Sequence, residues 1–314
     1  MVPGASALPT PECLITLDLL CWLGSGREVA DRLQCNPSTV SRKSEACALS
    51  LGLFLRKRHG LWNLYGQTEL LQAERELHQR YRLAGYLPMR LDVSADAAGL
   101  LGVESGLRPW ETGGQGHLSV GRPLELLQQR VTDAWLCSFC DELPANLDAD
   151  WCVFDLCRLP LLLLAHVAHP LVARGNGITR GNGKQRLPEP AGELLPPGSL
   201  TDFPSVSLPV HCQPKRFAAL QRHGLGSTTV ALQRHDPLKW DGLLDDALSL
   251  RPGTELDLLQ HPDWRALPFG LDHQARIGLV FHRDLSGHAV TCHLVDRLER
   301  WRDGLATAAV TASC

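Results

Sequence analysis

Apolar residues recur at helical spacing over the first fifty positions of the chain. Leucines stand at every third position from 14 to 23, and a pair of nearby glycines predicts a tight corner before a second short helix that ends near Leu33. A third helix is expected from about Ser38 to Leu51, and Gly52 ends it. In residues 54–64, short apolar stretches flank a basic turn, which predicts a two-stranded hairpin.

The next segment, residues 67–83, predicts a long charged helix that carries an apolar stripe. Gly85 and Pro88 close this helix and mark a domain boundary. We expect it to be a linker helix whose stripe pairs with a second copy of the chain. The residues at spacings of three and four are Leu70, Leu71, Ala73, Glu74, Leu77 and Tyr81.

From Met89 onward, short strands alternate with helices, which is the pattern of an α/β domain. The apolar run over residues 159–172 predicts a buried strand or helix, and residues 174–197, rich in Gly and Pro, predict a long exposed loop. The expected strands are residues 90–94, 117–120, 134–139, 227–232 and 276–281, and the expected helices are residues 123–130, 214–223, 239–250 and 289–304.

The charge of the chain is unevenly distributed. The 314 residues are 44% hydrophobic and carry a formal net charge of −3, which indicates a globular protein of about two domains and argues against nucleic-acid binding along the whole chain. Residues 1–90, however, hold 11 Lys and Arg against 8 Asp and Glu, a net +3, and the remainder carries −6. Any contact with nucleic acid is therefore expected in the first part alone.

Eleven cysteines, an odd number scattered along the chain, predict at least one free thiol and a reducing compartment. Asp18 interrupts the first apolar stretch, so that stretch does not read as a signal peptide, and the run at 159–172 is shorter than the roughly 20 residues of a spanning helix. We expect a cytoplasmic protein with no membrane partner.

Cys137 and Cys140 form an isolated CxxC, and the spacing of the cysteines after it is not that of a structural zinc site. The residue pattern favours buried inert thiols. A redox or metal sensor is the alternative that stays open. No metal and no cofactor is predicted.

The third helix and the hairpin together carry residue types suited to DNA. A recognition helix needs short hydrogen-bonding side chains at its N-terminal end to meet base edges, and basic ones further along to hold phosphates. The other reading is a solvated helix face and a solubility patch. The helix offers Pro37, Ser38, Thr39, Ser41, Arg42 and Lys43, and the turn adds Arg56, Lys57, Arg58 and His59.

These residues carry a resemblance to a family. The segments EVADRL at 28–33, NPSTVSR at 36–42 and LFLR at 53–56 resemble the winged helix-turn-helix of LysR-type transcriptional regulators, with Val40-Ser41-Arg42 the best match. Weaker similarity continues at 124–136, 169–171, 200–203 and 276–301, so it covers nearly the whole chain. The chain departs from the family pattern at 36–39, where NPST stands in place of SQPA.

The resemblance implies a divergent family member that regulates transcription and catalyses no reaction. It implies a winged helix-turn-helix over residues 12–66, a dimerising linker helix over 67–88, and an α/β effector domain like periplasmic binding proteins over 89–314. The two subdomains would be about 89–165 with 270–314, and 166–269. The implied partners are an inverted-repeat promoter site in double-stranded DNA, a small-molecule effector, and further copies of the chain in a homodimer or homotetramer.

Open α/β sheets bind ligands just past the carboxyl ends of their strands, which makes Ser94, Asp96 and Ser138 the candidate effector contacts. Two other classes of function stay open. One is an enzyme that uses the α/β region, although its glycine-rich segment at 175–184 lacks the residues of a phosphate-binding loop. The other is a ligand-binding or redox- or metal-sensing protein whose DNA-binding head has decayed.

Overall fold

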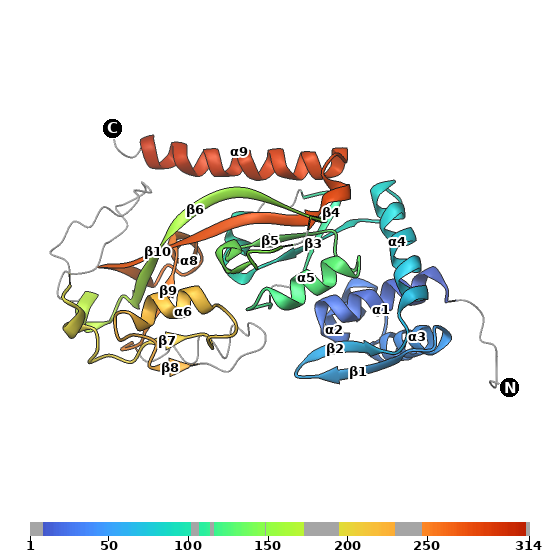
Figure 1. Cartoon of the computed structure of the whole chain (residues 1–314), viewed down its shortest axis with the longest axis horizontal. Helices are drawn as coiled ribbons and strands as arrows, with labels where there is room; N and C mark the ends of the chain where they lie inside the picture. Colours follow the sequence, from blue (N-terminus) through green and yellow to red (C-terminus); the bar gives the residue numbers. More distant parts are fainter. Residues whose placement is uncertain are drawn as a thin grey trace. The chain divides into compact units, whose positions relative to one another are not determined.

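The computed structural model describes residues 9–101, 107–113, 116–147, 149–172, 195–229 and 247–311, with side chains to residue 303. The chain forms two compact units (Figure 1). The first comprises Met1–Val93, Leu107–Gly114 and Gly121–Trp135, and the second comprises Ser94–Gly106, Gln115–Val120 and Leu136–Cys314.

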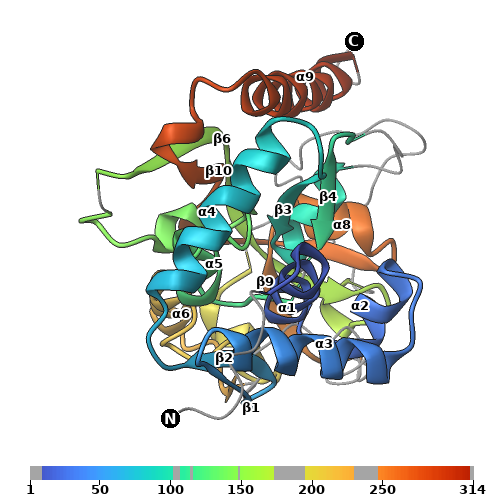
Figure 2. The same cartoon turned by 90° about the vertical axis from the view of Figure 1, so that its right-hand side faces the viewer.

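The first unit begins with three helices and a hairpin, as the apolar spacing predicts. The Thr10 hydroxyl caps the first helix, and Gly24, at φ +70°, ends it in the left-handed conformation that glycine tolerates. Figure 2 shows α3 along the lower edge of this unit, with α1 seen nearly end-on above it. The elements are α1 (Pro11–Leu23), α2 (Gly26–Arg32), α3 (Pro37–Ser50), β1 (Phe54–Arg58) and β2 (Leu61–Tyr65).

The hairpin turns through two residues only. His59 and Gly60 have φ values of +51° and +80°, which is the type I′ geometry that matches the twist of the flanking strands. The strands pair in antiparallel register from Phe54 opposite Tyr65 to Arg58 opposite Leu61. The turn thereby decides which side chains of β1 face outward.

The remaining elements of the first unit are α4 (Glu69–Leu83), β3 (Met89–Val93), β4 (Trp110–Gly113) and α5 (Gly121–Gln128). Strands β3 and β4 pair in parallel. Leu126 of α5 and the nearby Val131 are buried in one apolar cluster with residues of α1, α2 and α3, among them Trp22 and Val40. The hydrophobic core of this unit thus includes side chains far apart in the sequence.

Helix α4 turns its polar face inward. Arg75, His78, Gln79 and Arg82 are buried, whereas Leu70, Leu77 and Tyr81 of the predicted stripe are 67%, 48% and 50% exposed. Only Leu71 of the large residues in that stripe is buried. The helix therefore offers an apolar face to solvent.

Two fully buried carboxylates explain this orientation. Asp18 of α1 pairs with Arg75, its Oδ1 lying 2.8 Å from Nε, and its Oδ2 lies 3.5 Å from Nη1 of Arg90. Asp133 accepts hydrogen bonds from Nε and Nη2 of Arg82, each 2.8 Å long, and from the side chain of Gln79 at 2.9 Å. A buried charge is tolerated when it is paired and hydrogen-bonded, so α4 must present its arginines to these two aspartates.

The second unit is built around two long antiparallel strands, drawn as a curved pair of arrows in Figure 1. β6 (Trp151–His166) pairs with β10 (Trp264–His282), and β9 (Leu250–Gly253) pairs with β6. The short strands β7 (Val206–Ser207) and β8 (Thr228–Thr229) pair in parallel, and β5 (Ala134–Cys137) spans the boundary between the units. The helices are α6 (Pro214–Gln221), α8 (Glu255–Gln260) and α9 (Ala289–Thr311), with short 3₁₀ turns η1 (Ala95–Leu101), η2 (Cys140–Glu142), η4 (Pro197–Ser199) and η5 (Arg283–Leu285).

The expected mixed α/β class is confirmed, and two expected elements are wrong. Residues 117–120 form no strand because they lead directly into α5, and the strand lies instead at Trp110–Gly113. The end of the helix expected at 239–250 is wrong because residues 250–253 pair with β6 as β9. The rest of that helix (239–246), the last residues of the strand expected at 227–232, and most of the loop expected at 174–197 lie outside the described residues.

Within the described part of the chain, no helix is long and apolar enough to cross a membrane.

Replacing Arg75 by Ala is expected to lower the free energy of unfolding by about 3–5 kcal/mol, because it leaves the charge of Asp18 buried without its main partner. Chemical denaturation measures this loss. The matched control is Arg80→Ala, which removes an exposed arginine from the same helix and should change stability by less than about 0.5 kcal/mol. Equal effects of the two substitutions would contradict the assigned role of the buried pair.

Candidate nucleic-acid interface and ligand cavity

The N-terminal end of α3 is open to solvent. Asn36 caps the helix by accepting hydrogen bonds from the backbone NH of Ser38 at 2.9 Å and from its hydroxyl at 2.8 Å. Pro37, Ser38, Ser41 and Arg42 are exposed, and Thr39 and Lys43 are half-buried. The opposite face of the helix is anchored by Val40, Ser44, Cys47 and Ala48, which are buried. All the residues predicted on this helix therefore lie on one accessible end and face.

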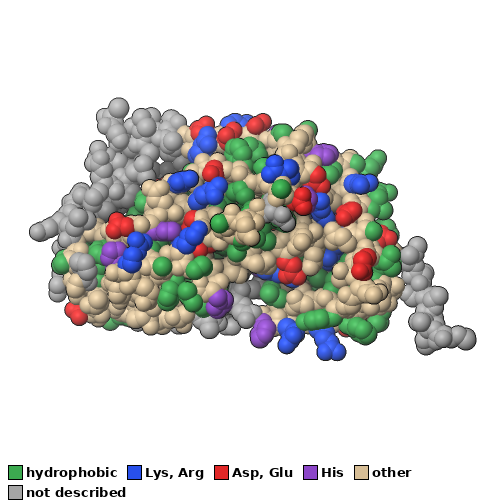
Figure 3. Space-filling model, viewed as in Figure 1, with side chains coloured by type: hydrophobic (Ala, Val, Ile, Leu, Met, Phe, Trp, Pro, Cys, Tyr) green, Lys and Arg blue, Asp and Glu red, His purple; other side chains and the backbone are tan. Residues whose placement is uncertain are grey.

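The hairpin separates its basic residues between its two faces. Arg56 and Arg58 share one face, opposite Asn63 and Leu61 of β2, and both are exposed. Lys57 lies on the other face, with its ammonium 5.6 Å from the centroid of the Trp62 ring. Exposed Lys and Arg side chains project from the lower edge of this region in Figure 3. Lys57 is exposed as well, and so is His59 at the turn, so all four side chains are accessible to a phosphate backbone.

Arg122 of α5 holds the hairpin on the first unit. Its Nη2 donates hydrogen bonds to the carbonyl oxygen of Cys21 at 3.0 Å and to that of Trp62 at 2.9 Å, and its Nη1 lies 2.7 Å from Glu125. The side chain reaches α1 and β2 at once. This buried guanidinium adds to the apolar packing of Leu55, Trp62 and Leu64 in holding the hairpin on the helices.

The structure brings together the three residues expected at an effector cleft. The Ser138 hydroxyl donates to Oδ2 of Asp96 at 3.3 Å, and the Ser138 backbone NH donates to the Ser94 hydroxyl at 3.4 Å. Both serines are buried, and of the three only Asp96 lines the cavity of the second unit. The two serines thus hold the chain segment that carries Asp96, and the Asp96 side chain faces the cavity.

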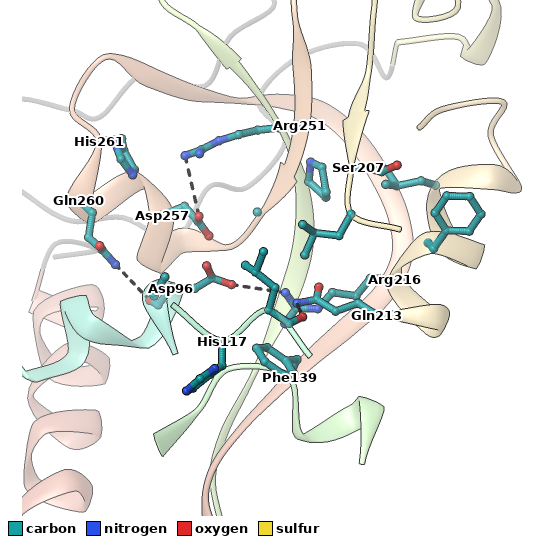
Figure 4. A pocket seen from close by; sticks show the side chains of 17 residues that line it. Asp96, His117, Phe139, Ser207, Gln213, Arg216, Arg251, Asp257, Gln260 and His261 are labelled. Carbon is teal, nitrogen blue, oxygen red and sulfur yellow. Dashed lines mark hydrogen bonds and ion pairs between the residues drawn. The ribbon is translucent and has the colours of Figure 1, made fainter. Parts of the chain in front are cut away.

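That cavity has a volume of about 80 Å³ and is shown in Figure 4. Its wall combines charged residues with apolar ones such as Phe139, Leu208 and Phe217. Polar side chains that converge on a partly apolar cavity are a feature of many ligand sites. The polar side chains of the wall are Asp96, His117, Ser207, Gln213, Arg216, Arg251, Asp257, Gln260 and His261.

Two arginines and two aspartates face one another across this cavity. Nη1 of Arg216 lies 3.6 Å from Oδ2 of Asp96, and Nη2 of Arg251 lies 3.8 Å from Oδ1 of Asp257. The Arg251 guanidinium also lies over the Trp264 ring, 4.4 Å from its centroid. Arg216 donates from Nη2 to the Ser138 carbonyl. Both arginines are almost fully buried and therefore fixed in position.

Asp257 also builds the start of α8. Its Oδ2 accepts hydrogen bonds from the Thr254 NH at 2.7 Å and from the Thr254 hydroxyl at 3.3 Å, and the Thr254 hydroxyl accepts one from the Leu256 NH, which completes a capping box. Burial, and after it the negative charge of Asp96, raises the pKa of Asp257 to about 6. This carboxyl can therefore change its charge near neutral pH.

Sequence reasoning missed Arg216, Arg251 and Asp257. The capping-box spacing from Thr254 to Asp257 could have located the start of α8. Arg251 was not identified because a helix was expected at 239–250, whereas the strand β9 begins at Leu250. Burial and pairing across long sequence separations leave no local signal.

Cys137 and Cys140 are both buried, and the Cys140 thiol donates to the Cys137 carbonyl at 3.8 Å. Burial, and after it the hydrogen bond with Cys140, raises the pKa of Cys137 well above its usual value. A thiol that stays protonated is a poor nucleophile and a poor metal ligand. The geometry favours the inert-thiol interpretation, and no cluster of metal-binding residues occurs in the described part of the chain.

No family model and no curated protein sequence matches the chain. Several solved structures are similar to the chain. CbnR, a LysR family transcriptional regulator, has a TM-score of 0.52 at 13% identity, over 93% of this chain and 98% of its own. Full-length CbnR in complex with its target DNA scores 0.50 at 15% identity over 92% and 99%, and ArgP from Mycobacterium tuberculosis scores 0.50 at 15% identity over 95% and 98%. The chain therefore shares, along nearly its whole length, the fold of a LysR family transcriptional regulator.

Proposed function

We propose that this protein is a transcription regulator that binds DNA through α3 and the hairpin and responds to a small-molecule effector. The observation that carries the proposal is the exposed N-terminal end of α3, with Ser38, Ser41 and Arg42 at the surface and the exposed Arg56 and Arg58 following on the hairpin. The similarity of fold to CbnR bound to its target DNA supports it. In this reading residues 12–66 are a winged helix-turn-helix.

Each side chain has a distinct expected role in the DNA complex. The short polar side chains of Ser38, Thr39 and Ser41, next to Pro37, would meet base edges in the major groove. Arg42 and Lys43 would hold the flanking phosphates. Arg56 and Arg58, with His59 at the turn, would contact the backbone on one side, and Lys57 would contribute mainly through its charge.

The apolar face of α4 supports a dimer. Leu70, Leu77 and Tyr81 are exposed along one side of the helix, at spacings that a second helix can cover. A pair of chains joined through residues 67–88 would present two copies of α3 to an inverted repeat, and two such pairs would make a tetramer. Two heads would also double the positive charge that faces DNA, which is only +3 in the first 90 residues.

Residues 89–314 would form the effector domain, with subdomains of about 89–165 plus 270–314 and 166–269, as in periplasmic binding proteins. The cavity around Asp96 is the proposed effector site, with Ser94 and Ser138 supporting it. An effector that binds one closure of the subdomains more tightly than another would shift the population of DNA-binding arrangements. In this proposal the chain catalyses no reaction.

DNA selection from a random library, performed at two salt concentrations, tests the function. The expected result is an inverted-repeat site whose affinity falls steeply with salt, because several basic side chains displace counterions. Unselective binding, or none, would contradict the proposal and favour a ligand-binding protein with a decayed head. Turnover of a substrate by the purified protein would instead indicate an enzyme.

On the selected site, Arg42→Ala is expected to weaken specific binding about tenfold or more, because a charge-assisted contact worth at least about 1.4 kcal/mol is lost. Retardation of labelled duplex measures the affinity, and circular dichroism should show an unchanged fold. The control is Arg222→Ala, which removes an exposed arginine from the second unit and should leave the affinity unchanged. Equal affinities of Arg42→Ala and the wild type would refute the role given to Arg42.

Leu77→Glu is expected to convert the oligomer to monomers, since it places a charge in the apolar face of α4. Analytical ultracentrifugation of the full chain measures the change. Val210→Glu, at an equally exposed apolar residue of the second unit, serves as the control and should leave the oligomer intact. An unchanged mass for Leu77→Glu would exclude this face as the dimer interface.

A further inference from the structure

The wall of the cavity in the second unit holds buried hydrogen-bond donors without an acceptor among the described residues. Arg251 and Ser207 are 2% and 1% exposed. Among the residues that the structure describes, none accepts a hydrogen bond from Nε or Nη2 of Arg251, from Nε of Arg216, or from the Ser207 hydroxyl. A buried donor left without an acceptor is unfavourable, because it has given up its hydrogen bonds to water and gained none in the protein. These three side chains thus favour a ligand that brings acceptor atoms.

One oxygen of each aspartate in the wall already accepts hydrogen bonds. Oδ2 of Asp257 accepts two hydrogen bonds from Thr254, and Oδ2 of Asp96 accepts one from Ser138 while it lies beside Arg216. A ligand ammonium would have to compete with these donors. An acceptor-only group, such as a carboxylate, can accept from Nε and Nη2 of Arg251, which donate to no described residue although Nη2 lies 3.8 Å from Oδ1 of Asp257.

The charges of the cavity wall place a further condition on the binding of an anion. Two arginines offset two aspartates, so an entering anion leaves one negative charge in excess unless a proton enters with it. Asp257 is placed to accept that proton on Oδ1. Its Oδ2 accepts the hydrogen bond that caps α8, whereas Oδ1 faces Arg251. The other charged or titratable groups around it are Asp96 from η1, Arg216 from α6, Glu255 on α8 itself, and His117 and His261 in the same wall.

We propose that this cavity binds a compact organic carboxylate together with one proton, the anion pairing with Arg251 and the proton, taken from solvent, binding to Oδ1 of Asp257. The inference rests on the proposed function in taking the cavity as the effector site. The volume of about 80 Å³ suits a compact ligand. The apolar side chains of Phe139 and Leu208 would cover its hydrocarbon part.

The raised pKa of Asp257, about 6, sets the direction of the pH dependence. Below that pH the free protein already holds the proton and binds the anion at full affinity. Above it, binding must take up a proton, so the dissociation constant should rise about eightfold from about pH 6.5 to pH 7.5.

Propionate is the probe, with propionamide as its uncharged counterpart, and titration calorimetry of the full chain is performed in two buffers of different ionisation enthalpy. We expect propionate alone to bind, with uptake of up to one proton at pH 7.5. Asp257→Asn imitates the protonated acid and keeps an oxygen for the Thr254 NH, so it should bind propionate without pH dependence and without proton uptake. Arg251→Gln should weaken binding at least about tenfold.

Glu255→Gln is the matched control, because Glu255 lies two residues away on the same helix, burial also raises its pKa, and it does not line the cavity. It should behave as the wild type. The proposal is overturned if propionate does not bind, if propionamide binds equally well, or if Asp257→Asn keeps the pH dependence, which would assign the proton to a histidine. Circular dichroism shows whether Arg251→Gln is folded. If it is not, the pH dependence of propionate binding to Asp257→Asn still tests the proposal.

DNA selection by the same preparations separates this proposal from the one it rests on. Propionate binding without DNA selection would leave the carboxylate site standing and refute the regulator. DNA selection without propionate binding would refute the carboxylate site and leave the proposed regulator standing.

Discussion

The buried carboxylates of Asp18 and Asp133 are the constraint on which the first unit depends. Each is fully enclosed, so each requires a cation, and α4 supplies both with Arg75 and Arg82. A helix that must turn its arginines inward turns its leucines outward. The same ion pairs that stabilise the fold thereby leave an apolar face of α4 exposed, and they link α1 to the start of β5 in one compact body.

The elements of the first unit could be predicted almost completely from sequence, because their signals are local. Leucine spacing, the Asn36 cap and the glycines after the helices each act within a few residues. The contacts between these elements were harder to predict. Asp18 was recognisable as a polar interruption in an apolar stretch, but its partner Arg75 lies 57 residues away, and nothing near either residue indicates the pairing.

In the second unit the local signals are weaker and the contacts more distant. β6 and β10 pair along almost their whole length although about a hundred residues separate them in sequence, and the pairing extends β10 well beyond the strand expected at 276–281. The cavity depends on the same long-range contacts. Asp96 could be proposed because it follows a strand. Arg216 lies on α6, a helix that was expected at 214–223, but its contact with the cavity has no local signal, and Arg251 lies on β9, which was not expected.

The proposed function depends on two features together: the inward polar face of α4, and the exposed N-terminal end of α3, which a dimer would present twice to DNA. Hydroxyl-radical footprinting of the full-length protein on its selected duplex tests this claim most directly. Two protected patches are expected on one face of the DNA, with centres that lie one helical turn, about 10 base pairs, or a whole multiple of it apart. A single patch, or uniform protection along the duplex, would contradict it.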